Sequence, residues 1–110
     1  MNKQLFSKNT EITEPLRVYI EERLDHLEQF NSEIMAARVD ISRDQHHNKG
    51  DIFRVEVNLN LRGKLLRVVE TCPDAREAID LVHDKLARQL RELKNKRLFL
   101  RRFSNIFKRN

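Results

Sequence analysis

The 110-residue chain has little of what cross-links, interrupts or anchors a polypeptide. A single cysteine, Cys72, excludes an internal disulfide, which in so short a chain is typical of a reducing compartment. Two glycines and two prolines are too few for a low-complexity linker or a collagen-like repeat. No apolar run approaches the roughly 18 residues that span a bilayer, and residues 1–7 lack the basic-then-apolar pattern of a secretory signal. We therefore expect one folded, cytoplasmic domain, because this length supplies one core and not two.

The sequence also lacks the motifs of the common enzyme classes. It has no glycine-rich phosphate loop, no nucleophile elbow and no paired-carboxylate motif. His46 and His47 are adjacent, which is a poor geometry for two ligands of one metal ion, and no cysteine or carboxylate spacing completes a site. Cys72 is expected to be structural, and His83 to be a packing residue at the edge of an apolar stripe. We expect no enzyme activity, no metal, no cofactor and no small-molecule substrate.

Negative charge is missing from the end of the chain. No acidic residue follows Glu92, whereas seven basic residues lie between residues 93 and 110. Residues 1–92 contain the other 15 of the 22 basic residues and all 17 acidic ones, so this part of the chain is nearly neutral. Residues 93–110 are strongly basic. This segregation points to a polyanionic partner, either nucleic acid or an anionic membrane, although a solvated helix end gives the same pattern.

Apolar residues recur with the period of a helix in two segments and with that of a strand in four. Helices are expected over residues 14–30 and from residue 74 onward, because apolar residues recur there at spacings of three and four. Strands are expected near residues 3–6, 35–42, 53–62 and 65–71. The inward-facing residues of the second strand are expected to be Met35, Ala37, Val39 and Ile41. Residues 44–50 are polar and end in glycine, which is typical of a loop.

The helix starts carry their own signals. Thr13 precedes Glu14 and Pro15, and Asp74 follows Pro73; each offers a side-chain oxygen to an unpaired amide at the start of a helix. The stripe that each helix is expected to bury consists of Leu16, Ile20, Leu24, Leu27 and Phe30 in the first, and of Ala75, Ile79, Val82, Leu86, Leu90 and Leu93 in the second.

The element order β-α-β-β-β-α predicts an α+β fold. A β-α-β start favours a right-handed crossover with a parallel first pair of strands, and the later hairpins are antiparallel. We therefore expect a four-stranded mixed sheet with both helices packed on one face. Its other face is expected to stay in water and carries Arg38, Asp40, Arg54, Glu56, Asn58 and Asn60. Which face of the fourth strand is buried cannot be decided from the sequence, because residues 65, 66, 68 and 69 are all apolar.

Three separated motifs occur in one order along residues 4–96. They are N-T-E-I-T-E-P-L-R at 9–17, L-E-Q-F at 27–30 and A-I-D-L-V-H-D-K-L-A-R-Q-L at 78–90. In sequence and spacing they resemble the ribosome hibernation promoting factor family, which includes the ribosome-associated inhibitor A proteins. The resemblance implies the same fold and translation inhibition in stationary or stressed cells, through binding to small-subunit rRNA in the decoding region that blocks tRNA and mRNA. Ending at Asn110, the chain resembles the short forms, which lack a C-terminal dimerisation domain.

The resemblance places RNA binding on the outer faces of the two helices. With the neighbouring basic residues of the last helix and the tail, the expected RNA-binding residues are Arg17, Arg23, Lys85, Arg88, Arg91, Lys94, Lys96, Arg97, Arg101 and Arg102. The expected partners are the small ribosomal subunit with its rRNA and the 70S ribosome. His26 and Glu92 depart from the family pattern, since many relatives have lysine at these positions.

Residues 98–110 are expected to form a basic, aromatic-containing tail outside a ribosome-binding domain of residues 1–97. On a helical wheel Phe99, Phe103 and Ile106 cluster, with Arg101 and Arg102 opposite. Such a segment could extend along rRNA with its aromatic rings stacked on bases, lie on an anionic membrane, or fold back on the domain or on another copy. The alternative function is therefore a peripheral membrane or protein-interaction adaptor acting through the tail, with a membrane the less favoured partner.

Overall fold

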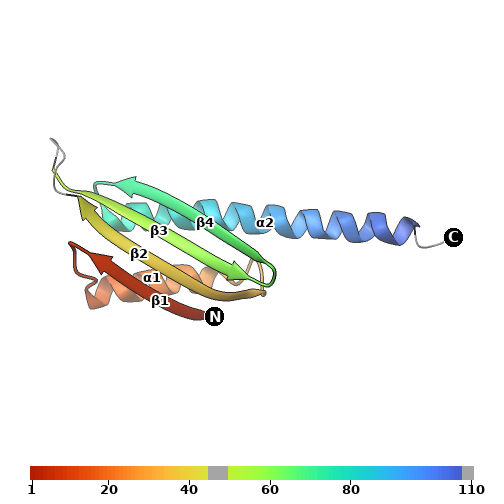
Figure 1. The fold of residues 1–110 in the computed structure, drawn as a ribbon, viewed down its shortest axis with the longest axis horizontal. Coiled ribbons are helices and arrows are strands. Elements are labelled where there is room, and N and C mark those ends of the chain that lie inside the picture. Colours follow the sequence, from red (N-terminus) through yellow and green to blue (C-terminus); the bar gives the residue numbers. More distant parts are fainter. Residues whose placement is uncertain (45–49, 108–110) are drawn as a thin grey trace.

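The computed structural model describes residues 1–44 and 50–107, with side chains described as far as Arg97. In chain order its elements are β1 (Asn2–Lys8), α1 (Glu14–Leu27), β2 (Ile34–Asp44), β3 (Ile52–Leu61), β4 (Lys64–Cys72) and α2 (Ala75–Phe107). Both helices lie on one face of the sheet, and α2 continues well past its end (Figure 1). The expected α+β fold is confirmed, except that α1 ends at Leu27 and residues 28–30 form a turn. The loop expected around His46 and His47 lies outside the described residues.

The strands lie in the order β1-β2-β3-β4. β1 pairs with β2 in parallel, and the two later pairs are antiparallel, as expected for a crossover followed by hairpins. Gly63 lies in the β3–β4 turn with φ +79°, a conformation that glycine adopts without a Cβ clash.

The expectation for the start of β2 was wrong at Met35. A register shift between Ile34 and Ala36 turns Ile34 into the core and leaves Met35 59% exposed. From Ala37 onward the alternation returns to the expected pattern, with Val39 and Ile41 buried. A single bulge therefore reverses the facing of the residues on one side of it, which the apolar pattern alone does not reveal.

The core lies between the sheet and the two helices. The structure settles the facing of β4: Leu66, Val68 and Cys72 are buried, whereas Leu65 is 62% exposed. Burial raises the pKa of the Cys72 thiol, with nearby carboxylates adding to the effect, so this cysteine is a poor nucleophile at neutral pH. The buried residues of the helices are Ile20, Leu24 and Leu27 in α1, and Ala78, Ile79, Val82, His83, Leu86, Ala87 and Leu90 in α2.

Both expected helix caps are present. The Leu16 amide donates to the Thr13 hydroxyl over 3.4 Å, and the Arg76 amide donates to the Asp74 carboxylate over 2.9 Å. The second helix then stays helical across residue 97, where the domain was expected to end, and runs on to Phe107. Its 33 residues correspond to about 50 Å at 1.5 Å per residue. Within the described residues, no helix combines the length and apolar character needed to cross a membrane.

A polar cluster lies between α1 and α2, where the sequence predicted only packing at the edge of a stripe. His83 is 6% exposed, and its Nε2 lies 2.9 Å from Nδ1 of His26. Its Nδ1 lies 3.2 Å from the Arg23 guanidinium and 3.1 Å from the Asp84 carboxylate. Burial is the main reason why the pKa of His83 is lowered; the charges of Arg23 and His26 lower it further, while Asp84 opposes them.

We expect His83 to make stability depend on pH. Its folded-state pKa lies below the value of about 6.5 in an unfolded chain, so the unfolded chain binds more protons as the pH falls through 6.5. The free energy of unfolding should therefore decrease between pH 7.5 and 5.5, and it should decrease less in His83→Gln. Urea unfolding of wild type and His83→Gln at both pH values measures the free energy of unfolding. The comparison isolates His83, because the carboxylates contribute equally in the two proteins. Equal decreases in the two proteins would exclude His83 as the group responsible.

Candidate nucleic-acid interface

The outermost face of α2 carries exposed cations. Arg88 lies opposite the buried stripe and is exposed, with no ion pair to any of the described side chains. Lys96 lies on the flank of α2 next to β4, beside a hollow of about 270 Å³ that it shares with Lys64 and Leu66. Lys85 lies on the same flank, but its ammonium pairs with Glu70 of β4. Of these three residues, Arg88 and Lys96 have no ion pair among the described residues, and Lys85 is already neutralised.

The other flank of α2 faces the turn after α1. The Arg91 guanidinium lies 5.3 Å from the centre of the Phe30 ring, a cation–π arrangement. Lys94 borders a hollow of about 300 Å³ lined mainly by residues 28–33, and Arg97 pairs across it with Glu33. The sequence showed both basic positions, but not the ring under Arg91 or the carboxylate beside Arg97, because both lie about 60 residues away in the chain.

The two cations of α1 are both paired. Arg17 lies 3.7 Å from Glu14 one turn earlier and remains exposed. Arg23 lies in the groove between the helices, 3.4 Å from Asp80 and 3.9 Å from Asp84, with 32% of its side chain exposed. Arg23 therefore holds α1 to α2 in this structure, in addition to any role toward RNA.

The expected basic surface thus divides into two groups. Arg17, Arg23, Lys85 and Arg97 are paired with carboxylates; Arg88, Arg91, Lys94 and Lys96 have no ion pair among the described residues. Glu92 is also exposed on α2. Arg101 and Arg102 lie on the helical backbone of α2, but their side chains are outside the described part.

His26 turns toward the seam between the helices. It binds His83 and meets the Phe30 ring edge-on, with the ring centres 5.4 Å apart. His26 therefore packs against α2 in this structure, and a lysine at this position could not make the same histidine–histidine contact. Among the described residues, no group of three or more histidine, cysteine, aspartate or glutamate side chains is placed to hold a metal ion.

The chemistry of these side chains suits the binding of a polyanion. Guanidinium groups present a planar fork of donors to phosphate oxygens, and lysines supply point charges. Such contacts fix the position of a protein on a nucleic acid without reading its bases. Exposed ion pairs contribute only about 0–1 kcal/mol each, so pairs such as Arg17–Glu14 can open and give their cation to a phosphate.

Comparison with known proteins finds relatives that share one family. A family model described as Sigma 54 modulation protein / S30EA ribosomal protein matches residues 4–98. The chain is 41% identical over 93 residues to the ribosome hibernation promotion factor of Deinococcus radiodurans, and 30% identical over 93 residues to that of Staphylococcus aureus. These alignments cover 84% of this chain but 49% and 48% of the relatives, so the chain spans about half the length of the curated proteins it matches.

Solved structures share the fold. The N-terminal domain of Thermus thermophilus Protein Y matches with a TM-score of 0.72 at 32% identity, over 84% of this chain and 99% of that one. A ribosomal subunit interface protein from Coxiella burnetii matches with a TM-score of 0.76 over 86% of this chain and 99% of that one; at 22% identity this likeness shows the fold alone. Because the family model covers most of the chain, the resemblance seen in the sequence is confirmed, and the chain belongs to the family described as Sigma 54 modulation protein / S30EA ribosomal protein.

Proposed function

We propose that this chain is a ribosome hibernation module that silences translation by occupancy. In this proposal the outer surface of α1 and α2 lies against rRNA of the small subunit in the decoding region, on the 30S particle and on the 70S ribosome. The bound domain fills space that tRNA and mRNA would otherwise use. Inhibition by occupancy needs no catalytic group, because the cations of this surface only have to hold phosphates.

One observation carries the proposal: Arg88, Arg91, Lys94 and Lys96 are unpaired cations on one helix, which packing on the sheet holds in fixed relative positions. Because α2 is continuous and packs on the sheet, the backbone positions of these residues are fixed relative to one another, with Arg88 outermost, Arg91 and Lys94 on one flank and Lys96 on the other. The relatives named as ribosome hibernation promotion factors support ribosomal RNA as the polyanion. The helical backbone of residues 98–107 extends past the sheet, so the contacts proposed for Arg101 and Arg102 would lie beyond the main body of the domain (Figure 1).

Reversing one unpaired charge should weaken ribosome binding. Arg88→Glu removes a cation from the outermost face of α2 and puts an anion against phosphate, so we expect an affinity loss on the order of tenfold. Cosedimentation with 30S and 70S particles at 50 mM salt measures it. Arg62→Glu is the matched control, because it makes the same change in net charge at an exposed position in the β3–β4 turn, outside the two helices. Equal binding by both variants would contradict docking through this face.

Binding should also fall steeply with salt. If roughly seven phosphates are neutralised, the logarithm of the affinity should fall with the logarithm of salt concentration at a slope near −6. Between 50 and 200 mM this amounts to a loss on the order of 10³ to 10⁴. Affinity measured by cosedimentation across this range gives the slope, and Arg88→Ala should make it shallower by about one. A slope shallower than about −2 would mean that phosphate contacts do not dominate.

Deleting residues 98–110 separates the proposed function from the adaptor alternative. If the tail only extends the rRNA contact, its loss should weaken ribosome binding at least tenfold through Arg101 and Arg102, and should matter little for liposomes. Cosedimentation with ribosomes and flotation with anionic liposomes measure the two activities separately. Unchanged ribosome binding together with lost liposome binding would instead favour a membrane role for the tail.

A further inference from the structure

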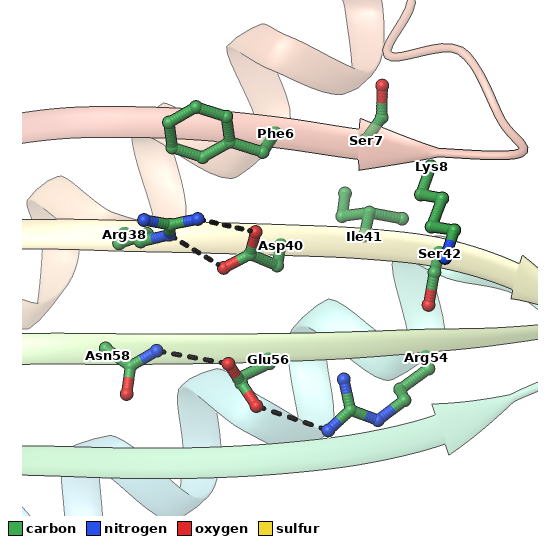
Figure 2. Close-up of a pocket in the computed structure, with 10 residues that line it drawn as sticks. All are labelled: Phe6, Ser7, Lys8, Arg38, Asp40, Ile41, Ser42, Arg54, Glu56 and Asn58. Atoms are coloured by element: carbon green, nitrogen blue, oxygen red, sulfur yellow. Dashed lines mark hydrogen bonds and ion pairs between the residues drawn. The ribbon is translucent and has the colours of Figure 1, made fainter.

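The face of the sheet opposite the helices is open and hollowed. A groove of about 630 Å³ crosses β1, β2 and β3, and its floor is β2. Figure 2 shows its polar side chains, among them Arg38, Asp40 and Glu56, on the near side of the strands, with the helices behind the sheet. No described element covers this face (Figure 1). A volume of this size lies within the range of about 300–1,000 Å³ that is typical of small-ligand sites.

The charges on this face are layered. The Arg38 guanidinium binds Asp40, with Nε to oxygen at 3.0 Å; Glu56 accepts from Arg54 at 3.2 Å and from Arg67 at 2.6 Å. The three arginine side chains are 55%, 46% and 59% exposed, but Asp40 is 33% exposed and Glu56 only 17%. The cations therefore lie above the carboxylates that hold them, and a ligand arriving from solvent meets guanidinium groups first.

Glu56 keeps this arrangement charged. The hydrogen bond from Arg67 is the main reason why the pKa of Glu56 is lowered; Asn58 and Arg54 lower it further, while partial burial opposes them. The carboxylate is therefore ionised throughout the neutral range and anchors two arginines at once. With three guanidinium groups over two carboxylates, the patch has a surplus of positive charge, to which Lys8 adds at one end of the groove.

A flat stacking surface borders the same groove. Phe6 of β1 is 44% exposed, although aromatic rings are usually turned inward, and the Arg38 guanidinium lies 4.4 Å from its ring centre. Aromatic rings and arginine side chains are what unpaired bases stack on in many single-strand-binding proteins. Asn58 adds an amide at the groove, with one donor already directed to Glu56 at 3.3 Å.

We infer that the open face of the sheet binds unpaired nucleotides of single-stranded RNA, with a base stacked on the Phe6–Arg38 pair and phosphates on the arginines. The combination of arginines and an exposed aromatic ring favours this ligand class. A surplus of guanidinium groups held by carboxylates favours an anion, and an exposed ring with a guanidinium beside it favours a flat ligand. An acidic peptide satisfies only the first condition. The site lies across the sheet from α1 and α2, so it does not depend on the function proposed above.

Fluorescence anisotropy with a labelled eight-nucleotide oligouridylate and the corresponding oligoadenylate tests this at 50 mM salt. The full chain should bind both. Phe6→Leu keeps an apolar side chain but removes the ring, so the affinity should fall on the order of tenfold, whereas Phe6→Tyr keeps the ring and should retain binding. Circular dichroism checks that both variants remain folded, which is expected because residue 6 is exposed.

The charge requirement has its own matched pair. Arg54→Gln removes a cation at the groove while Arg67 stays on Glu56, so oligonucleotide binding should weaken severalfold. Arg76→Gln removes one cation near the start of α2 and should change nothing. Amide shifts in NMR spectra recorded with the oligonucleotide should include β1, β2 and β3, in addition to any shifts that the cations of α2 cause on their own face.

The inference would be overturned if wild type showed no saturable oligonucleotide binding, if Phe6→Leu bound as tightly as wild type, or if amide shifts were confined to the helices. A glutamate-rich peptide of equal charge that binds with the same dependence on Phe6 would also overturn it, by making the face a site for acidic peptides. The function proposed above is tested by Arg88→Glu and ribosomes, so either proposal can fail while the other stands.

Discussion

The packing of α1 and α2 on one face of the sheet is the interaction on which both charged surfaces depend. Large side chains such as Leu86 and Leu90 are fully buried there, and truncating one such leucine to alanine costs about 2–5 kcal/mol in typical cores. Domains of this size have only about 5–15 kcal/mol of total stability, so the inward-facing positions are not free to carry charge. Charge is confined to the outer face of the helices and the open face of the sheet, where it can meet a ligand.

Internal carboxylates decide which cations are ready to bind. Lys85 is half exposed, and its pair with Glu70 can be exchanged for a phosphate at small cost. Arg23 differs, because it sits between the helices beside two aspartates and the buried His83, and releasing it would remove one charged partner from each of these groups. Cations that look equivalent in the sequence therefore differ in the free energy needed to break their ion pairs. We expect the unpaired cations to make the first contacts with a phosphate.

Apolar periodicity predicted the six elements and their order, and Thr13 and Asp74 predicted the two helix caps, because residues close together in the chain set these features. Features that depend on residues distant in the chain were missed. A bulge at the start of β2 turned Met35 outward, and His83, although buried as a packing residue should be, binds His26 of the other helix. The basic positions of the interface were visible in the sequence, but their pairing was not, since Glu70 and Lys85 meet only after β4 packs on α2.

If both faces bind anions as proposed, they do so on different physical terms. Unpaired side chains on α2, such as Lys94 and Lys96, have no ion pair among the described residues that restricts them, so ordering them on binding costs side-chain entropy that charge neutralisation must offset. The arginines of the sheet are held by Asp40 and Glu56 before any ligand arrives, so they lose less freedom on binding. Part of their charge is already neutralised, which leaves stacking on Phe6 as the larger contribution. Binding on the sheet face would therefore depend less on salt than binding on the helix face, even with the same polymer as ligand.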